Sequence, residues 1–190
     1  YLRFGLSLSN DFAGNAYFQA LGTYRRTWVN ELGAEWRTDV RLGRLDGLAT
    51  EFYQPLLVDE SIFVAPMLDI ERKRIDVFDD DVRVATFNRR TTTLGLDIGS
   101  RLGRYGELRA GVFRGSRRFE LETGPALFAA GTGRPDIGGL RLRGHTDQLD
   151  SSNFPRHGYA ASFDIVDMRP GFGAQDRYTR WEAELSSMLS

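Results

Sequence analysis

The side chains alternate most sharply at Ala34-Glu35-Trp36-Arg37-Thr38-Asp39-Val40-Arg41-Leu42. The even positions are apolar or threonine, whereas the odd positions from 35 to 41 are all charged. Successive side chains of a β-strand point to opposite faces, whereas a helix returns to the same face every three or four residues. The stretch therefore predicts a strand with one charged face, and no helix fits its spacing.

The same alternation recurs along the chain and predicts an all-β protein. Leu94, Leu96 and Ile98, for example, alternate with Gly95, Asp97 and Gly99. Glycine, asparagine, aspartate and proline gather between such segments, as turns require. We expect about ten strands in an antiparallel up-and-down sheet, near residues 1–9, 16–29, 34–44, 47–55, 62–77, 82–102, 106–116, 138–149, 158–167 and 177–190.

Composition excludes several classes of function. The 190 residues include no cysteine, so a disulfide framework, a thiol nucleophile and a zinc ribbon are excluded. The 25 basic and 26 acidic residues nearly cancel, which argues against nucleic-acid binding driven by net charge. Lys73 is the only lysine. Arginine is planar and bidentate, so this bias favours crowded charge pairs inside a lumen.

The connectors of an up-and-down sheet lie alternately at its two rims. We number the connectors from the start of the chain. The odd-numbered ones include the longest, and they fall near 10–15, 45–47, 78–81, 117–137 and 168–176. The even connectors are compact, near 30–33, 56–61, 103–105 and 150–157. We therefore expect one rim with long loops, as in outer-membrane barrels.

Several segments resemble one known family. They are Tyr1–Leu6, Tyr24–Trp28 with Ala34–Thr38, Glu51–Leu56, Gly106–Gly111, and Leu149-Asp150 with Asn153–Tyr159. Together they are similar to the β-barrel of the bacterial surface antigen (BamA/TamA) superfamily, most closely to the C-terminal barrel of patatin-like phospholipase autotransporters. The resemblance implies a transmembrane β-barrel of about sixteen strands. Residues 1–190 would then be a single partial barrel domain, truncated at both ends, and an open curled sheet unless its two edges meet.

This interpretation assigns the two faces of the strands. The predicted lumen-facing charges are Arg3, Arg25, Glu35, Arg37, Asp39, Arg41, Glu51, Asp69, Glu71, Asp97, Glu107 and Arg109. The predicted lipid-facing residues are Leu2, Phe4, Leu6, Trp36, Val40, Leu42, Leu94, Leu96, Ile98, Phe163, Trp181 and Leu185. The family's turn motifs correspond to Gln54, Pro55, Phe154, Pro155, Arg156 and Gly158.

The resemblance also implies a function and a location. We expect an outer-membrane barrel of a Gram-negative-type bacterium that anchors, and helps to translocate, an attached patatin-like phospholipase domain upstream. Its partners would be outer-membrane lipid and that passenger domain, with a homo-oligomer left open and no nucleic acid. Two alternatives stand beside this one. They are a BamA/TamA-type barrel for protein assembly or export, and a soluble ligand-binding barrel with an apolar interior.

We expect no catalysis, cofactor or metal in this segment. The sequence has no G-x-S-x-G elbow, the motif that carries the serine of patatin-like lipases, and Gly115-Ser116 is followed by arginines. His145 and His157, the acidic turn at 76–81, and the glycines at 131–139 match no ligand spacing or phosphate loop. They are more simply interpreted as wall and turn residues.

Overall fold

The computed structural model describes residues 1–10, 16–43, 45–80, 82–151 and 156–188. They form one sheet of ten antiparallel strands in chain order, which confirms the predicted all-β, up-and-down fold. The strands are β1 Leu2–Asn10, β2 Ala16–Arg26, β3 Glu35–Gly43, β4 Leu45–Pro55, β5 Ile62–Asp79, β6 Val82–Arg101, β7 Glu107–Thr123, β8 Asp136–Asp147, β9 Gly158–Met168 and β10 Tyr178–Met188. Two short 3-10 helices, η1 Ala126–Gly131 and η2 Pro170–Phe172, lie between strands.

The predicted end of one strand is wrong. The sequence predicted a strand at 106–116 and a connector at 117–137, but β7 continues to Thr123. Residues 117–121 are strongly polar, yet they pair in register with Phe87–Thr91 of β6. Backbone hydrogen bonds to β6 therefore extend β7 beyond the point where the apolar alternation stops.

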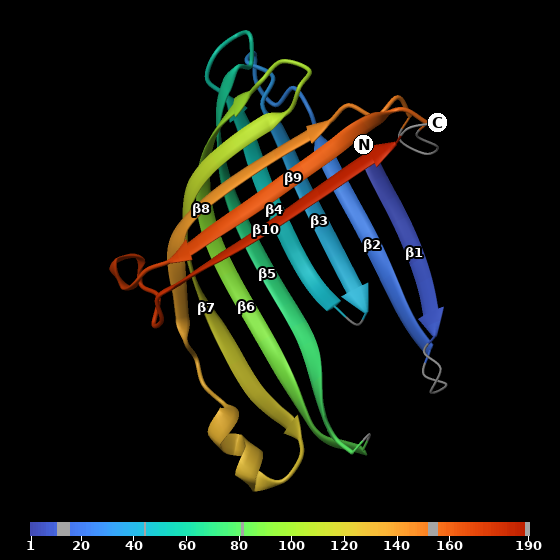
Figure 1. Cartoon of the computed structure of the whole chain (residues 1–190), viewed down its shortest axis with the longest axis vertical. Coiled ribbons are helices and arrows are strands. Elements are labelled where there is room, and N and C mark those ends of the chain that lie inside the picture. The colour runs from blue at the N-terminus through green and yellow to red at the C-terminus, as the bar shows by residue number, and fades with distance from the viewer. Residues whose placement is uncertain (11–15, 44, 81, 152–155, 189–190) are drawn as a thin grey trace.

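The sheet is open and strongly curled. β1 and β10 stand at the two ends of the strand order, and each has one neighbouring strand in the described part of the chain. This confirms the expectation of an open sheet, with the first and last strands as its edges. Figure 1 shows β8, β9 and β10 crossing in front of β3 and β4, so the sheet curls back over itself.

The register gives the sheet two chemically distinct faces. Cross-strand partners share a face, and one row runs through Phe4, Gly22, Val40, Leu48 and Ile70. We call the side that carries this row the apolar face. The adjacent row, on the other side, passes through Thr23, Asp39, Ala49 and Asp69. We call that side the charged face.

One rim of the sheet projects farther than the rest because three neighbouring strands are long. β5, β6 and β7 have 18, 20 and 17 residues, whereas β3 and β4 have 9 and 11. The longer strands project at one end of the sheet, at the bottom of Figure 1. That rim carries the connectors at 124–135 and 169–177, but β3 and β4 also join there, between Gly43 and Leu45. This rim therefore has two long connectors beside a short one, and its reach comes from the projecting strands.

Two small apolar clusters lie on the charged face, and no single core connects them among the described residues. One comprises Tyr53, Phe63 and Ala65. Phe63 is fully buried, and its ring lies against Gly99, where an added Cβ would come within 2.2 Å of the ring. The other comprises Phe113, Ile137, Val166, Met168 and Ala174. The Arg109 guanidinium lies 4.9 Å from the Phe63 ring centroid, so the charged residues described below border the first cluster.

Candidate functional surfaces

The apolar face is exposed across the whole sheet. The register places all the predicted lipid-facing residues on this face, on β1, β3, β6, β9 and β10. Each is exposed, from 37% of the side chain for Phe163 to 81% for Phe4. A soluble monomer rarely exposes a contiguous apolar patch of more than a few hundred Å². A face of this extent therefore needs an apolar environment or a partner.

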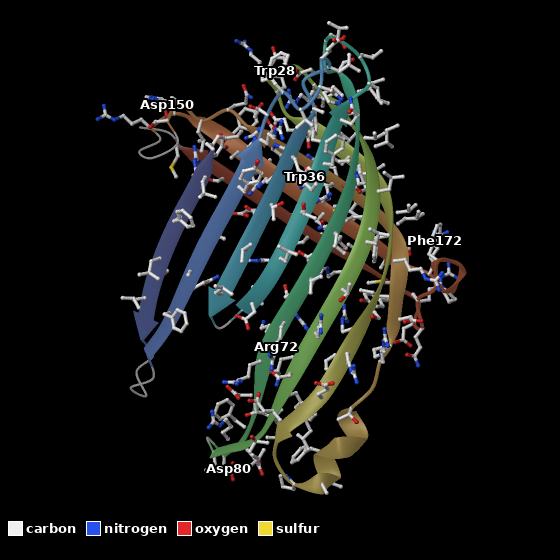
Figure 2. The ribbon with its side chains drawn as sticks, turned by 180° about the vertical axis from the view of Figure 1, so that it is seen from behind. Trp28, Trp36, Arg72, Asp80, Asp150 and Phe172 are labelled. Carbon is white, nitrogen blue, oxygen red and sulfur yellow. The ribbon has the colours of Figure 1, made fainter. Side chains whose placement is uncertain are left out.

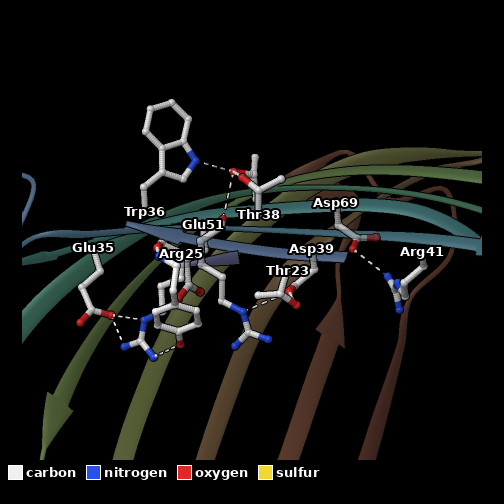
Figure 3. A network of polar contacts seen from close by, with 12 residues as sticks. Thr23, Arg25, Glu35, Trp36, Thr38, Asp39, Arg41, Glu51 and Asp69 are labelled. Atoms are coloured by element: carbon white, nitrogen blue, oxygen red, sulfur yellow. Dashed lines mark hydrogen bonds and ion pairs between the residues drawn. The ribbon is translucent and has the colours of Figure 1, made fainter. Parts of the chain in front are cut away.

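Three polar side chains on the apolar face are hydrogen-bonded to one another. The Trp36 indole Nε1 donates a hydrogen bond to Thr50 Oγ1 at 2.8 Å, and Thr50 Oγ1 lies 3.0 Å from Thr38 Oγ1. Figure 3 shows Trp36 and Thr38 on one side of the ribbon and the Arg25–Glu35 pair on the other. Internal bonding of such groups lowers the cost of placing them in a medium without water.

The charged face is a network of arginine–carboxylate pairs. The pairs are Arg25–Glu35, Arg37–Asp39 at 2.9 Å, Arg41–Asp69 at 3.6 Å, Arg89–Glu71 at 2.7 Å, Arg109–Glu51 at 2.7 Å, Arg109–Glu107, Arg143–Asp97 and Arg141–Asp164 at 2.6 Å. All the predicted lumen-facing charges lie on this face by register. Among them, Arg3 makes a different contact, since its guanidinium lies 4.9 Å from the Tyr1 ring centroid.

Some members of the network were not among the predicted residues. Arg89, Arg141, Arg143 and Asp164 take part in three of the ion pairs. A signal for two of them exists in the sequence, because Arg141 and Arg143 alternate with Leu140 and Leu142. Their partners are not evident from spacing, since Arg143 and Asp97 are 46 residues apart.

The charged face is concave. Arg109 on β7 reaches Glu51 on β4, although β5 and β6 lie between those strands. A hollow of about 650 Å³ is lined by side chains from β3, β4 and β7 to β10, including Arg37, Glu107 and Glu182. Strands at opposite ends of the sheet thus meet around one polar space.

The most buried carboxylate of the network sits over a glycine. Asp97 is 1% exposed and forms an ion pair with Arg143. A Cβ at Gly111, on the neighbouring strand, would come within 1.9 Å of Asp97 Oδ1. Burial of a charge is costly unless it is paired, so Gly111 provides the space in which this pair forms.

The described residues of the predicted turn motifs, Gln54, Pro55, Arg156 and Gly158, lie at the opposite rim. Gln54 Nε2 donates to the Pro55 carbonyl at 2.6 Å, and Asn30 Nδ2 donates to Gln54 Oε1 at 2.7 Å, which ties two connectors together. Phe154 and Pro155 lie outside the described residues. Gly158 has a φ of 115°, and an added Cβ would come within 2.2 Å of the Gln148 carbonyl oxygen. Only glycine fits that position without strain.

A carboxylate organises the same turn. The backbone amides of Arg156 and His157 donate to Asp150 Oδ1 at 2.9 and 3.2 Å. These two hydrogen bonds stabilise the ionised carboxylate and hold the pKa of Asp150 below its usual value.

The other residues considered for catalysis or metal binding are dispersed. Ser116 lies within β7 and not on a strand-to-helix turn, His145 lies on β8, and Gly138 and Gly139 lie in β8. In the described part of the chain, no group of three or more histidine, aspartate or glutamate side chains is placed to hold a metal ion. None of the helices in that same part has both the length and the apolar character needed to span a membrane.

Comparison with protein-family models and with curated proteins finds no match to this chain. The structure therefore defines its class by geometry alone. It is a ten-stranded antiparallel sheet, open and curled, with an exposed apolar convex face and a concave face of paired charges.

Proposed function

We propose that this chain forms part of the wall of a bacterial outer-membrane β-barrel, which anchors an attached patatin-like phospholipase domain and assists its translocation. The observation that carries the proposal is the exposed apolar face, which continues over the strands from β1 to β10. Lipid is the surrounding medium that would cover such a face on every strand at once.

The charged face supports the same proposal. Barrels of this class have a polar interior, and paired arginines and carboxylates keep such an interior nearly neutral. A soluble ligand-binding barrel would have the opposite arrangement, with apolar side chains around its cavity. Here the hollow is lined by Arg37, Glu51 and Arg109, whereas Leu96 and Trp181 are exposed on the other side.

Single cysteines on the two faces test the membrane part of the proposal, since the chain has none of its own. Val40→Cys places a probe on the apolar face, and Ala49→Cys places one on the charged face of the neighbouring strand. After reconstitution in phosphatidylcholine vesicles, we expect a fluorophore at position 40 to be quenched by nitroxide-labelled lipid and one at 49 by aqueous iodide. A probe at 40 quenched by iodide alone, in a protein soluble without detergent, would refute the membrane assignment.

The attached domain is tested by the coding sequence upstream of Tyr1. A phospholipase parent requires a G-x-S-x-G elbow between a strand and a helix. Tandem small α/β repeats without that elbow would instead support the assembly-type barrel. The two outcomes distinguish these functions, and either is compatible with this chain forming part of a barrel wall.

A further inference from the structure

Three arginines from neighbouring strands form a row on the apolar-face side of the projecting strands. Arg72 of β5 is the cross-strand partner of Arg90 of β6, which is the partner of Arg118 of β7. All three side chains are exposed. Figure 2 shows Arg72 on this projecting part, toward the labelled Asp80. We call these residues the arginine row.

The row is poorly neutralised by the protein itself. Like charges placed directly opposite each other destabilise a sheet. Arg118 pairs with Glu120 at 2.9 Å, but Arg72 and Arg90 make no ion pair with any described residue. Asp46 follows Arg72 in the same row, and its Oδ1 accepts the backbone amide of Gly43 at 2.9 Å. The charged face, where arginine–carboxylate pairs predominate, shows the opposite pattern.

Neither of two further carboxylates nearby forms an ion pair with the row. Glu122 receives two hydrogen bonds from Arg74, at 2.8 and 3.1 Å, and a third from Asn88 at 2.9 Å. Asp136 lies beside Ser116, one same-face step from Arg118, and makes no ion pair in the described part of the chain. The row therefore retains positive charge that an external anion would neutralise.

The arginine row borders the apolar face. On β6 the same side carries Arg90, then Thr92, Leu94 and Leu96. The strand rise places Leu96 about 20 Å from Arg90, which becomes about 15 Å along the membrane normal at a strand tilt near 40°. That is half the thickness of a hydrocarbon core of about 30 Å. With Leu96 near mid-bilayer, the arginine row would lie at the level of the lipid headgroups.

A groove on the apolar face is lined in part by residues of the three strands that carry the row. It has a volume of about 670 Å³ and is lined mainly by apolar side chains of β5 to β9, among them Leu96, Val112 and Leu140. Small residues line its floor at Ala110 and Gly111. A groove of this shape and polarity would accept an acyl chain, and a headgroup attached to that chain could reach the row.

We propose that the arginine row binds the phosphate groups of an anionic lipid whose acyl chain lies along the groove, an inference that rests on the proposed membrane location. The guanidinium group suits phosphate because it donates two parallel hydrogen bonds. Two strand spacings separate Arg72 from Arg118 by about 10 Å. The row therefore spans one diphosphorylated headgroup or two adjacent monophosphorylated ones.

A probe beside the row tests this binding. Ser116→Cys lies between the row and the groove, on the same side. The labelled full chain is reconstituted in phosphatidylcholine vesicles that contain a small, equal amount of nitroxide-labelled phosphatidylglycerol or nitroxide-labelled phosphatidylcholine. We expect stronger quenching by the anionic lipid. In an Arg72→Gln, Arg90→Gln, Arg118→Gln variant, this preference should fall by roughly fivefold per arginine removed.

A matched variant controls for net charge. Arg26, Arg104 and Arg156 are exposed at the opposite rim, and their replacement by glutamine removes the same charge. That variant should retain the preference for phosphatidylglycerol at position 116. Equal loss in both variants would show a general effect of charge and would overturn the proposal.

The remaining outcomes separate this inference from the proposed function. If both lipids quench the probe equally in the chain that keeps all three arginines, the proposed preference for anionic lipid is wrong. The contact with lipid would still support the membrane location. Absence of quenching by either lipid would refute both. Preference that is abolished by inorganic phosphate at the concentration of the labelled lipid would assign the row to a soluble anion and would also overturn the proposal.

Discussion

Adjacent residues of β4 allow a sharp test of the two faces. Leu48 lies on the apolar face between Val40 and Ile70, and its side chain is 36% exposed. Ala49 lies on the charged face between Asp39 and Asp69. Leu48→Arg and Ala49→Arg each add one positive charge to the chain, so a change in net charge cannot explain a difference between them.

The expected magnitudes differ clearly. Arginine on the lipid face near the middle of a bilayer costs about 2–4 kcal/mol in transmembrane barrels. At position 49 the guanidinium would lie between two carboxylates, where cross-strand opposite charges contribute about 0.2–1 kcal/mol. If the apolar face were in water, Leu48→Arg would change stability by only about 0.5 kcal/mol, as is usual for surface substitutions.

The assay is reversible unfolding in guanidinium chloride in the presence of phosphatidylcholine vesicles, with tryptophan fluorescence as the signal. We expect Leu48→Arg to lower the free energy of unfolding by about 2–4 kcal/mol and Ala49→Arg to leave it nearly unchanged. A loss at position 49 equal to that at position 48, or a loss below about 1 kcal/mol at position 48, would refute the assignment of the faces.

Three further predictions concern the network, the rim and the apolar face. Gly111→Ala should destabilise the fold by about 3 kcal/mol in guanidinium unfolding, because its Cβ displaces the buried Asp97 from Arg143, whereas Gly171→Ala, with open space around it, should be neutral. Because the folded-state pKa of Asp150 is lowered, its stabilisation is present above the unfolded-state pKa and is lost as the pH falls through the folded value. The Tm of the unmodified chain should therefore exceed that of Asp150→Asn by its full amount at neutral pH, and the two values should converge in acid. A Tm difference that does not change with pH would contradict the role of the two amides. Trp36→Phe should cost about 1 kcal/mol, measured as a coupling energy with Thr50→Val, and a coupling near zero would show that the indole hydrogen bond is not stabilising.

Alternation predicts the strands well where only one face is apolar. The predicted strand 34–44 corresponds to β3 at Glu35–Gly43, and 62–77 corresponds to β5 at Ile62–Asp79. The prediction fails at the end of β7, where Arg117 and Arg118 interrupt the apolar pattern. There the strand is maintained by its partner β6, and a partner 30 residues away leaves no local signal in the sequence.

The faces of individual residues were predictable, but their contacts were not. Period two places Glu51 and Arg109 on the charged side of their strands, and the register agrees. Their ion pair at 2.7 Å depends on the curvature of the four strands from β4 to β7, which no short stretch of sequence specifies. The arginine row is hidden for a related reason, because its members meet only through the register of three strands.

Arginine occupies two distinct environments in this structure. On the charged face, Arg109 contacts Glu51 and Glu107 together, and a lysine ammonium could not present the same planar fork of donors. On the other side, Arg72 and Arg90 project where the apolar face ends and make no ion pair with a described residue. The nearly balanced charge of the chain therefore hides an uneven distribution, with paired charges on the charged face and unpaired arginines where the apolar face ends.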